Sequence, residues 1–229
     1  VIQSELGQVF SALGYLSQAR EAYEAAVTIA RSLNDRAAVG IDLDRLATLA
    51  LHEGHADEAR SHLEEALSIF RECKLPGAQA VALHHLGVAA EMSQLWDDAE
   101  QHYADAARLL VDCRDYESAA RLFMLAAGVC LKAGRPDASE SWYREALQHS
   151  RLGINPVDLR RNLSQLARLL QMKPGSLSEA RELIEEALEA GENSLEPDVW
   201  ELYGQLADVI DLEAASTADA GASQGLGAT

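Results

Sequence analysis

The fold is decided by residues 6–26, LGQVFSALGYLSQAREAYEAA, which carry Leu-Gly-x2-Phe, then a glycine, then Ala-x3-Tyr-x2-Ala. The same pattern returns about every 40 residues along a chain of 229. An internal repeat of this kind is the first feature to look for, because it sets the architecture before any single element does. The residues spaced by 40 from the first leucine are Leu6, Leu46, Leu86, Ala126, Leu166 and Leu206.

A second register confirms the period in the other half of each unit. Small residues recur at Ala19, Ala59, Ala99, Ser139 and Ala180, followed by a large residue at Tyr23, Leu63, Tyr103, Tyr143 and Ile184. One extra residue near Pro174–Gly175 explains the shift of the last members. The sequence therefore predicts five full units and a sixth half-unit.

Each unit is predicted to be a pair of helices. Leu83, Leu86, Gly87 and Ala90 have the spacing of one helical face. Glycine ends the first helix at Gly14, Gly54, Gly134 and Gly175, with Gln94 as the exception. Small residues after each first-helix leucine let two helices approach closely, and the tyrosine or leucine of the second helix fills the wedge. No unit can bury its apolar face alone, so stability depends on stacking.

The pattern Leu6-Gly7-x2-Phe10 … Ala19-x3-Tyr23-x2-Ala26 resembles the tetratricopeptide repeat. The length of 40 residues, rather than the usual 34, resembles the long-repeat subset found in bacterial transcriptional regulators, signalling ATPases and kinesin light chains. The resemblance implies an all-α, right-handed superhelical solenoid of helix-turn-helix repeats. It also implies a concave groove, lined by the first helices, that binds polypeptides.

The predicted domain organisation is a solenoid over residues 1–213 and a tail over residues 214–229. A capping helix is expected at 198–213, because Glu201, Asp208 and Asp211 would give it a polar outer face. The tail is rich in Ala, Gly, Ser and Thr, and it has too few large apolar residues to offset the entropy of ordering. Disorder is therefore predicted there.

Composition and charge exclude several classes of function. The net charge of −18 disfavours binding of nucleic acid, since the phosphate backbone would be repelled. No apolar stretch is long enough to span a membrane. The three cysteines form no CxxC pair, which disfavours a zinc site and fits a reducing, cytoplasmic setting. No nucleophile motif or phosphate-binding loop is present, so we expect neither an enzyme nor a cofactor or metal site.

The resemblance assigns groove positions to particular residues of this sequence. Arg161 is added to them on the basis of charge. The candidate peptide-binding residues are Gln8, Asp44, Thr48, His52, His84, Glu91, Met124, Lys132, Arg161, Ser164, Arg168 and Gln171. Residues 116–172 hold 8 basic and 5 acidic side chains between acidic flanks. This basic segment predicts either an acidic partner docking through Arg121, Lys132, Arg161 and Arg168, or a solvated face with ordinary ion pairs.

Two functional hypotheses follow. The chain is either a scaffold that binds a protein or peptide in its groove, or a ligand- or peptide-sensing regulatory domain of a larger transcriptional regulator or signalling protein. The missing initiator Met favours a module of a longer chain. Arginine outnumbers lysine 16 to 3, which points to a GC-rich bacterial genome. The sequence sets neither the partner nor the oligomeric state.

Overall fold

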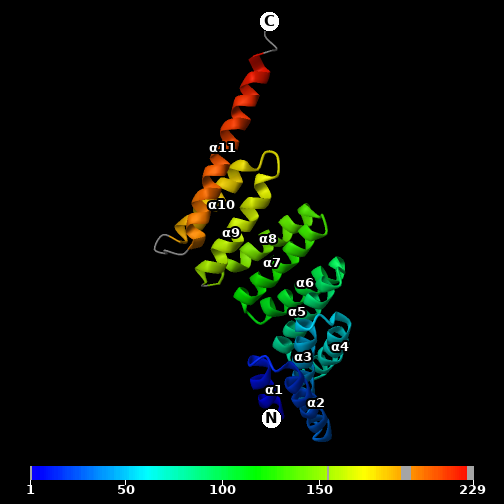
Figure 1. Ribbon diagram of the computed structural model, residues 1–229. Coiled ribbons are helices and arrows are strands. Elements are labelled where there is room, and N and C mark those ends of the chain that lie inside the picture. Colours follow the sequence, from blue (N-terminus) through cyan, green and yellow to red (C-terminus); the bar gives the residue numbers. More distant parts are fainter. Residues whose placement is uncertain (1, 154, 192–196, 226–229) are drawn as a thin grey trace.

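The computed structural model describes residues 2–153, 155–191 and 197–225, and these form eleven α-helices. Helices adjacent in the chain pack against each other as consecutive pairs, so the predicted all-α repeat fold is confirmed (Figure 1). The helices are α1 (Ile2–Ala12), α2 (Leu16–Ser32), α3 (Arg36–His52), α4 (Ala56–Glu72), α5 (Pro76–Met92), α6 (Trp96–Asp112), α7 (Tyr116–Lys132), α8 (Pro136–Ser150), α9 (Pro156–Gln171), α10 (Leu177–Glu189) and α11 (Pro197–Gly225).

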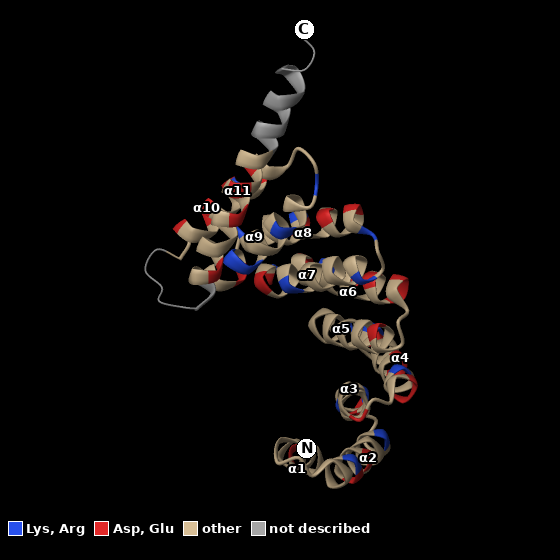
Figure 2. Cartoon of the chain, turned by 45° about the horizontal axis from the view of Figure 1, so that its top comes forward, with Lys and Arg blue, Asp and Glu red and all other residues tan. Residues whose placement is uncertain are grey.

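The stack of helix pairs curves into an arc. Figure 2 shows the odd-numbered first helices along the inner side of this arc and the second helices α2, α4, α6 and α8 along its outer side. Alanines recur on the second helices, and all five are buried: Ala26, Ala66, Ala106, Ala146 and Ala187. Their small size lets the following first helix pack closely, as the repeat pattern predicts.

The wedge between paired helices depends on glycine facing tyrosine. A Cβ atom placed on Gly87 would lie 2.5 Å from Cε1 of Tyr103, and one placed on Gly7 would lie 2.5 Å from the same atom of Tyr23. Real Cβ atoms do not approach a ring carbon so closely. Tyr103 is only 1% exposed. The predicted pairing of a small residue with a ring is therefore a direct contact in units one and three.

Helix starts follow the capping residues of the sequence. The carboxylates of Asp35 and Asp115 accept hydrogen bonds from the backbone N–H groups of Ala38 and Ser118, at 3.1 Å each. Pro76 and Pro156 occupy the first turns of α5 and α9, where a missing N–H group has no helical partner to lose. Both prolines therefore lie at the start of the first helix of a unit.

Helix ends use a left-handed residue whether or not it is glycine. Gly14, Gly54, Gly134 and Gly175 have φ angles between 72° and 83°. Gln94, which breaks the glycine pattern of the sequence, takes the same conformation with φ of 57°. This conformation crowds the Cβ atom of any residue but glycine.

We therefore expect Gln94→Gly to raise the free energy of unfolding by about 0.5–1 kcal/mol, because the left-handed turn would lose its strained side chain. Urea denaturation of the unaltered chain and of Gln94→Gly measures the difference in their free energies of unfolding. Gly134→Gln, the reverse change at the next equivalent turn, should lower the stability. An equal or lower stability of Gln94→Gly would show that the side chain itself contributes to the turn.

The C-terminal helix differs from the sequence prediction. The predicted cap at 198–213 forms the packed part of α11, but the helix continues to Gly225, through most of the segment expected to be disordered. Alanine has the highest intrinsic helix propensity, so a helix anchored by packed residues is expected to extend into Ala-rich sequence. Residues 226–229 lie outside the described part, and the division at residue 213 stays a prediction.

The N-terminal helix exposes a face that every later unit buries. Ile2 of α1 is 80% exposed, whereas Asp42, Ala82, Leu122 and Asn162, at the same repeat position, are between 0% and 7% exposed. Those later positions are covered by the second helix of the preceding unit. No such helix lies against α1 among the described residues, so this end of the stack is its least covered part.

Candidate functional site

The predicted groove residues lie together on the first helices. They are distributed as Gln8 on α1; Asp44, Thr48 and His52 on α3; His84 and Glu91 on α5; Met124 and Lys132 on α7; and Arg161, Ser164, Arg168 and Gln171 on α9. These helices line the inner side of the arc in Figure 2. Whether these residues bind a ligand stays a prediction.

Several of these side chains contact one another across unit boundaries. A carboxylate oxygen of Asp44 lies 2.8 Å from Nδ1 of His85 on the next first helix. Glu91 forms an ion pair with Lys132 and accepts a hydrogen bond from the hydroxyl of Tyr103 at 3.0 Å. Polar residues on consecutive first helices therefore link the units along the inner side.

The contacts at α9 extend this arrangement to α11. Arg168 forms an ion pair with Glu201, and the Ser164 hydroxyl is hydrogen-bonded to the Gln205 side-chain amide at 3.0 Å. Gln205 is buried and Glu201 is exposed. Glu201 was predicted as part of the polar outer face of the cap, and its carboxylate instead neutralises a predicted groove cation.

The remaining predicted groove residues are not described by contacts between units. Gln8 and His52 are exposed. The Thr48 hydroxyl donates to the backbone carbonyl of Asp44 on its own helix at 2.9 Å. Met124 packs against the apolar core, and Gln171 is half-buried with its Nε2 atom unpartnered among the described residues. The structure therefore leaves Gln8, His52 and Gln171 more available to a ligand than Met124.

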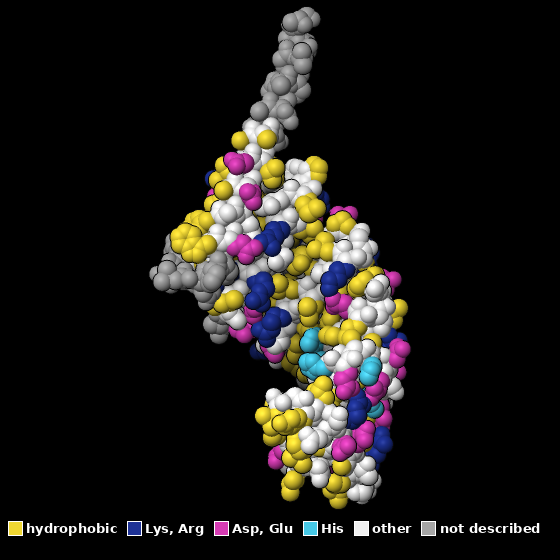
Figure 3. Space-filling view, in the orientation of Figure 1, with side chains coloured by type: hydrophobic (Ala, Val, Ile, Leu, Met, Phe, Trp, Pro, Cys, Tyr) yellow, Lys and Arg dark blue, Asp and Glu magenta, His cyan; other side chains and the backbone are white. Residues whose placement is uncertain are grey.

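The four cations predicted to dock an acidic partner fall into two pairs. Lys132 and Arg168 each have an acid of their own, as described above. Arg121 and Arg161 instead share Asp158: Nη1 of Arg121 lies 2.8 Å from one carboxylate oxygen, and Nη1 of Arg161 lies 3.6 Å from the other. Two positive charges thus surround one buried carboxylate. Figure 3 shows Lys and Arg side chains gathered over this middle part of the molecule.

Hollows lie between consecutive first helices. One apolar hollow has a volume of about 490 Å³ and lies between α5 and α7. Its walls are formed by Gly77, Ala80, Val81, His84, Leu110, Asp115, Ser118, Arg121, Leu122 and Leu125. A smaller hollow between α3 and α5, of about 150 Å³, is lined by Ile41, Asp44, Arg45, Phe70, Ala78 and Val81. The inner side therefore combines apolar recesses with charged side chains.

Sequence reasoning missed several residues of this face. Val81 and Leu125 are exposed apolar residues at the hollow, and Asp158 is the acid between the two arginines. The sequence did carry a signal for Val81, because Ile41 is an apolar residue at the same repeat position one unit earlier. The structure shows that both side chains are exposed. Asp158 carried no such signal, since its partners are fixed only by the packing of α7 on α9.

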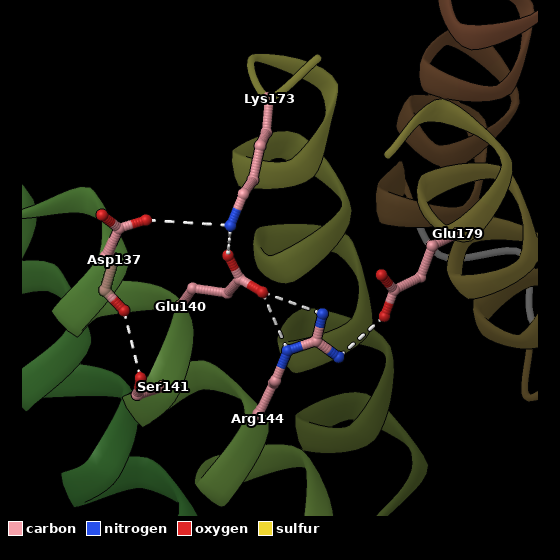
Figure 4. Close-up of polar contacts among 6 residues, drawn as sticks. All are labelled: Asp137, Glu140, Ser141, Arg144, Lys173 and Glu179. Atoms are coloured by element: carbon pink, nitrogen blue, oxygen red, sulfur yellow. Dashed lines mark hydrogen bonds and ion pairs between the residues drawn. The ribbon is translucent and has the colours of Figure 1, made fainter. Parts of the chain in front are cut away.

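The outer side is held by a different set of ion pairs, shown in Figure 4. Arg144 of α8 pairs with Glu140 on its own helix and with Glu179 of α10, at 2.9 and 2.7 Å. Lys173, in the turn that holds the extra residue, lies 2.8 Å from Glu140. The Lys173 ammonium and the Arg144 guanidinium lower the pKa of Glu140 against the effect of its partial burial. These contacts join units rather than form a recess.

His84 is a half-buried titratable group on this face. Burial and the neighbouring His85 lower the pKa of His84 below its ordinary value of 6.5, although the nearby Asp44 acts in the opposite direction. The ring of His84 lies 6.0 Å from that of Tyr103. The folded chain therefore favours the neutral imidazole.

We expect this histidine to make the fold less stable in mild acid. Below pH 6.5 the unfolded chain binds this proton more readily than the folded chain, so the unfolding free energy falls as the pH drops. The variant His84→Met, which copies Met124 of the next unit, should lose less stability between pH 7.5 and 5.5 when urea midpoints are compared. His102, whose pKa burial also lowers, is unchanged in both proteins and serves as the internal reference. An identical pH dependence in the variant would contradict the role of His84.

No group of three or more His, Cys, Asp or Glu side chains among the described residues is placed to hold a metal ion. None of the described helices is long and apolar enough to cross a membrane. Cys73, Cys113 and Cys130 are all free thiols.

The fold and its inner face define a helical repeat domain of the tetratricopeptide type. The family model for the tetratricopeptide repeat matches residues 1–72, which form the first units of the stack. Domains of this family generally act in protein interaction and are typically non-catalytic. No curated protein sequence matches the chain.

Solved structures extend the likeness to nearly the whole chain. The signal transduction ATPase with a tetratricopeptide repeat sensor from Pyrococcus horikoshii superposes with a TM-score of 0.78 and 16% identity, over 93% of this chain but only 33% of that one. BtubC from P. vanneervenii gives a TM-score of 0.67 and 20% identity, over 87% of this chain and 84% of that chain. Apo RapI gives a TM-score of 0.70 and 13% identity, over 84% of this chain and 70% of that chain. At these identities the likeness is one of fold.

Proposed function

We propose that this domain is a protein-interaction scaffold that binds a segment of another polypeptide along the inner side of its arc. The observation that carries the proposal is the series of solvent-open hollows between consecutive first helices. Exposed apolar side chains such as Val81 and Leu125 line them beside charged groups. An extended or helical segment of a partner would fill such recesses with side chains, and the reducing setting expected from the three free thiols is the cytoplasm.

A photo-crosslinking experiment tests the location of the partner. A benzophenone amino acid is placed at Val81 on the inner side, or at the exposed Ser61 on the second helix α4 as a matched control. Irradiation in native cells should give a defined protein adduct from position 81 and none from position 61, as identified by mass spectrometry. Adducts from position 61 alone, or none from either, would contradict the proposal.

A second candidate function is that of a sensing module in a larger regulator of the long-repeat subset. It is favoured by the superposition of 93% of this chain on the ATPase whose repeats are described as a sensor. A sensor should gain thermal stability from a small molecule or short peptide, because a ligand that binds only the native state stabilises it. A shift in melting temperature in a metabolite screen, without any crosslinked protein, would favour this candidate over the scaffold.

A further inference from the structure

The hollow between α5 and α7 is suited to one bulky apolar side chain. Val81 and Leu125 face it while 47% and 39% exposed, and Leu110 and Leu122 complete its wall. Its volume of about 490 Å³ exceeds that of any single side chain, so a leucine or aromatic side chain could enter with part of its own backbone. Burying such a side chain would anchor a segment by removing apolar surface from water, but apolar burial alone would not select one segment over another.

An anion site adjoins this hollow. Arg121 lines the hollow, and Arg161 occupies the same repeat position one unit further along, with a side chain 57% exposed. Both share the single carboxylate of Asp158, which is 8% exposed. A guanidinium has five N–H donors, so the two arginines, which share one carboxylate, keep donors for a ligand.

The other predicted cations do not extend this site. Lys132 is paired with Glu91 and Arg168 with Glu201, so each carries a compensating charge at its own position. Of the four predicted cations, Arg121 and Arg161 are therefore the two that share one acid, beside an apolar hollow that Asp115 also lines. The result is an adjacent pair of subsites with different chemistry.

We propose that these subsites recognise an acidic segment of another protein, which places one bulky apolar side chain in the hollow and one or two carboxylates on Arg161 and Arg121. The proposal rests on the scaffold function and narrows its partner. Packed helices lie about 8–10 Å apart. An extended chain advances about 3.3 Å per residue. The carboxylate is thus expected about three residues from the apolar residue.

Selection from a random library of 12-residue peptides displayed on phage, against the whole chain, tests this proposal. The enriched peptides should share a leucine or aromatic residue separated by two or three residues from Asp or Glu. Their affinity, measured by fluorescence anisotropy, should fall several-fold between 50 and 500 mM NaCl, because salt screens the ion pairs.

Two variants on exposed positions locate the binding, and two others serve as controls. Leu125→Ser and Arg161→Ser should each weaken binding about tenfold, through the hollow and the anion site respectively. Arg31→Ser and Arg71→Ser, on the second helices α2 and α4, should change it less than about twofold. Circular dichroism and thermal melting show that each variant is folded. Should Leu125→Ser lose stability, Val81→Thr replaces it.

The possible failures are distinguishable. The selected peptides could bind Leu125→Ser and Arg161→Ser as tightly as the unaltered chain, and crosslink to a benzophenone placed at His52 on the inner side. In that case the composite site is wrong and the scaffold function stands. If the peptides lack acidic residues, the charge complementarity is wrong. If no peptide binds the inner side and Val81 gives no crosslink, both proposals are overturned.

Discussion

Gly87→Ala should lower the free energy of unfolding by about 2 kcal/mol, although alanine is the better helix former. The added methyl group would meet Cε1 of Tyr103 at 2.5 Å, and that ring is held by the hydrogen bond of its hydroxyl to Glu91. Overpacking of this kind costs about 1–3 kcal/mol. Urea denaturation gives the total effect, and hydrogen exchange of the α5 amides shows whether unit three is the part that loosens.

The chain provides both a control and a rescue for this prediction. A methyl group on Gly128 would meet nothing within 4 Å, so Gly128→Ala in α7 should instead stabilise by up to about 1 kcal/mol through helix propensity. The double variant Gly87→Ala/Tyr103→Leu copies the pair Ala47 and Leu63 of unit two, both of which are buried. It should be more stable than the sum of its single changes. Strict additivity would show that the wedge is not the cause.

Asp42→Ala should destabilise the N-terminal units by about 2 kcal/mol. The Asp42 carboxylate is buried, accepts a hydrogen bond from Ser4 of the preceding unit, and lies 2.9 Å from Nη1 of Arg45. Removing one member of a buried pair leaves the other charge uncompensated. Partial exposure of Arg45 keeps the loss below that of a fully buried pair. The measurement is the urea midpoint, together with hydrogen exchange in α1 and α3.

Unit three shows how this position is built without an acid. It carries Ala82 and His85 where unit two carries Asp42 and Arg45. The double variant Asp42→Ala/Arg45→His should therefore recover part of the lost stability. Asp57→Ala, which removes an exposed carboxylate from α4, should change stability by less than about 0.5 kcal/mol. A loss as large as that of Asp42→Ala in this control would indicate a general charge effect.

The repeat fold could be predicted because its determinants are local and recur. Gly87 facing Tyr103, the prolines that begin units and the glycines that end first helices all follow from spacing alone. Gln94 was the visible exception, and the structure shows that the turn conformation is kept there without glycine. The extension of α11 could not be predicted from burial, because Ala-rich sequence continues a helix by propensity once α10 holds its first turns.

The candidate site could be predicted less well than the fold. Repeat positions placed the groove residues on the correct helices, since the inner face follows from the period. Which cations remain available depends on partners 33 to 41 residues away, such as Glu201 for Arg168 and Glu91 for Lys132. The hollow at Val81 depends on how far α5 and α7 separate. Composition cannot give that distance.

The packing of each helix on its neighbours in the chain has a mechanical consequence. In a stack whose units contact mainly their neighbours, each junction between units can open locally. Opening at one junction therefore leaves a distant recess, such as the hollow between α5 and α7, formed until the opening reaches it.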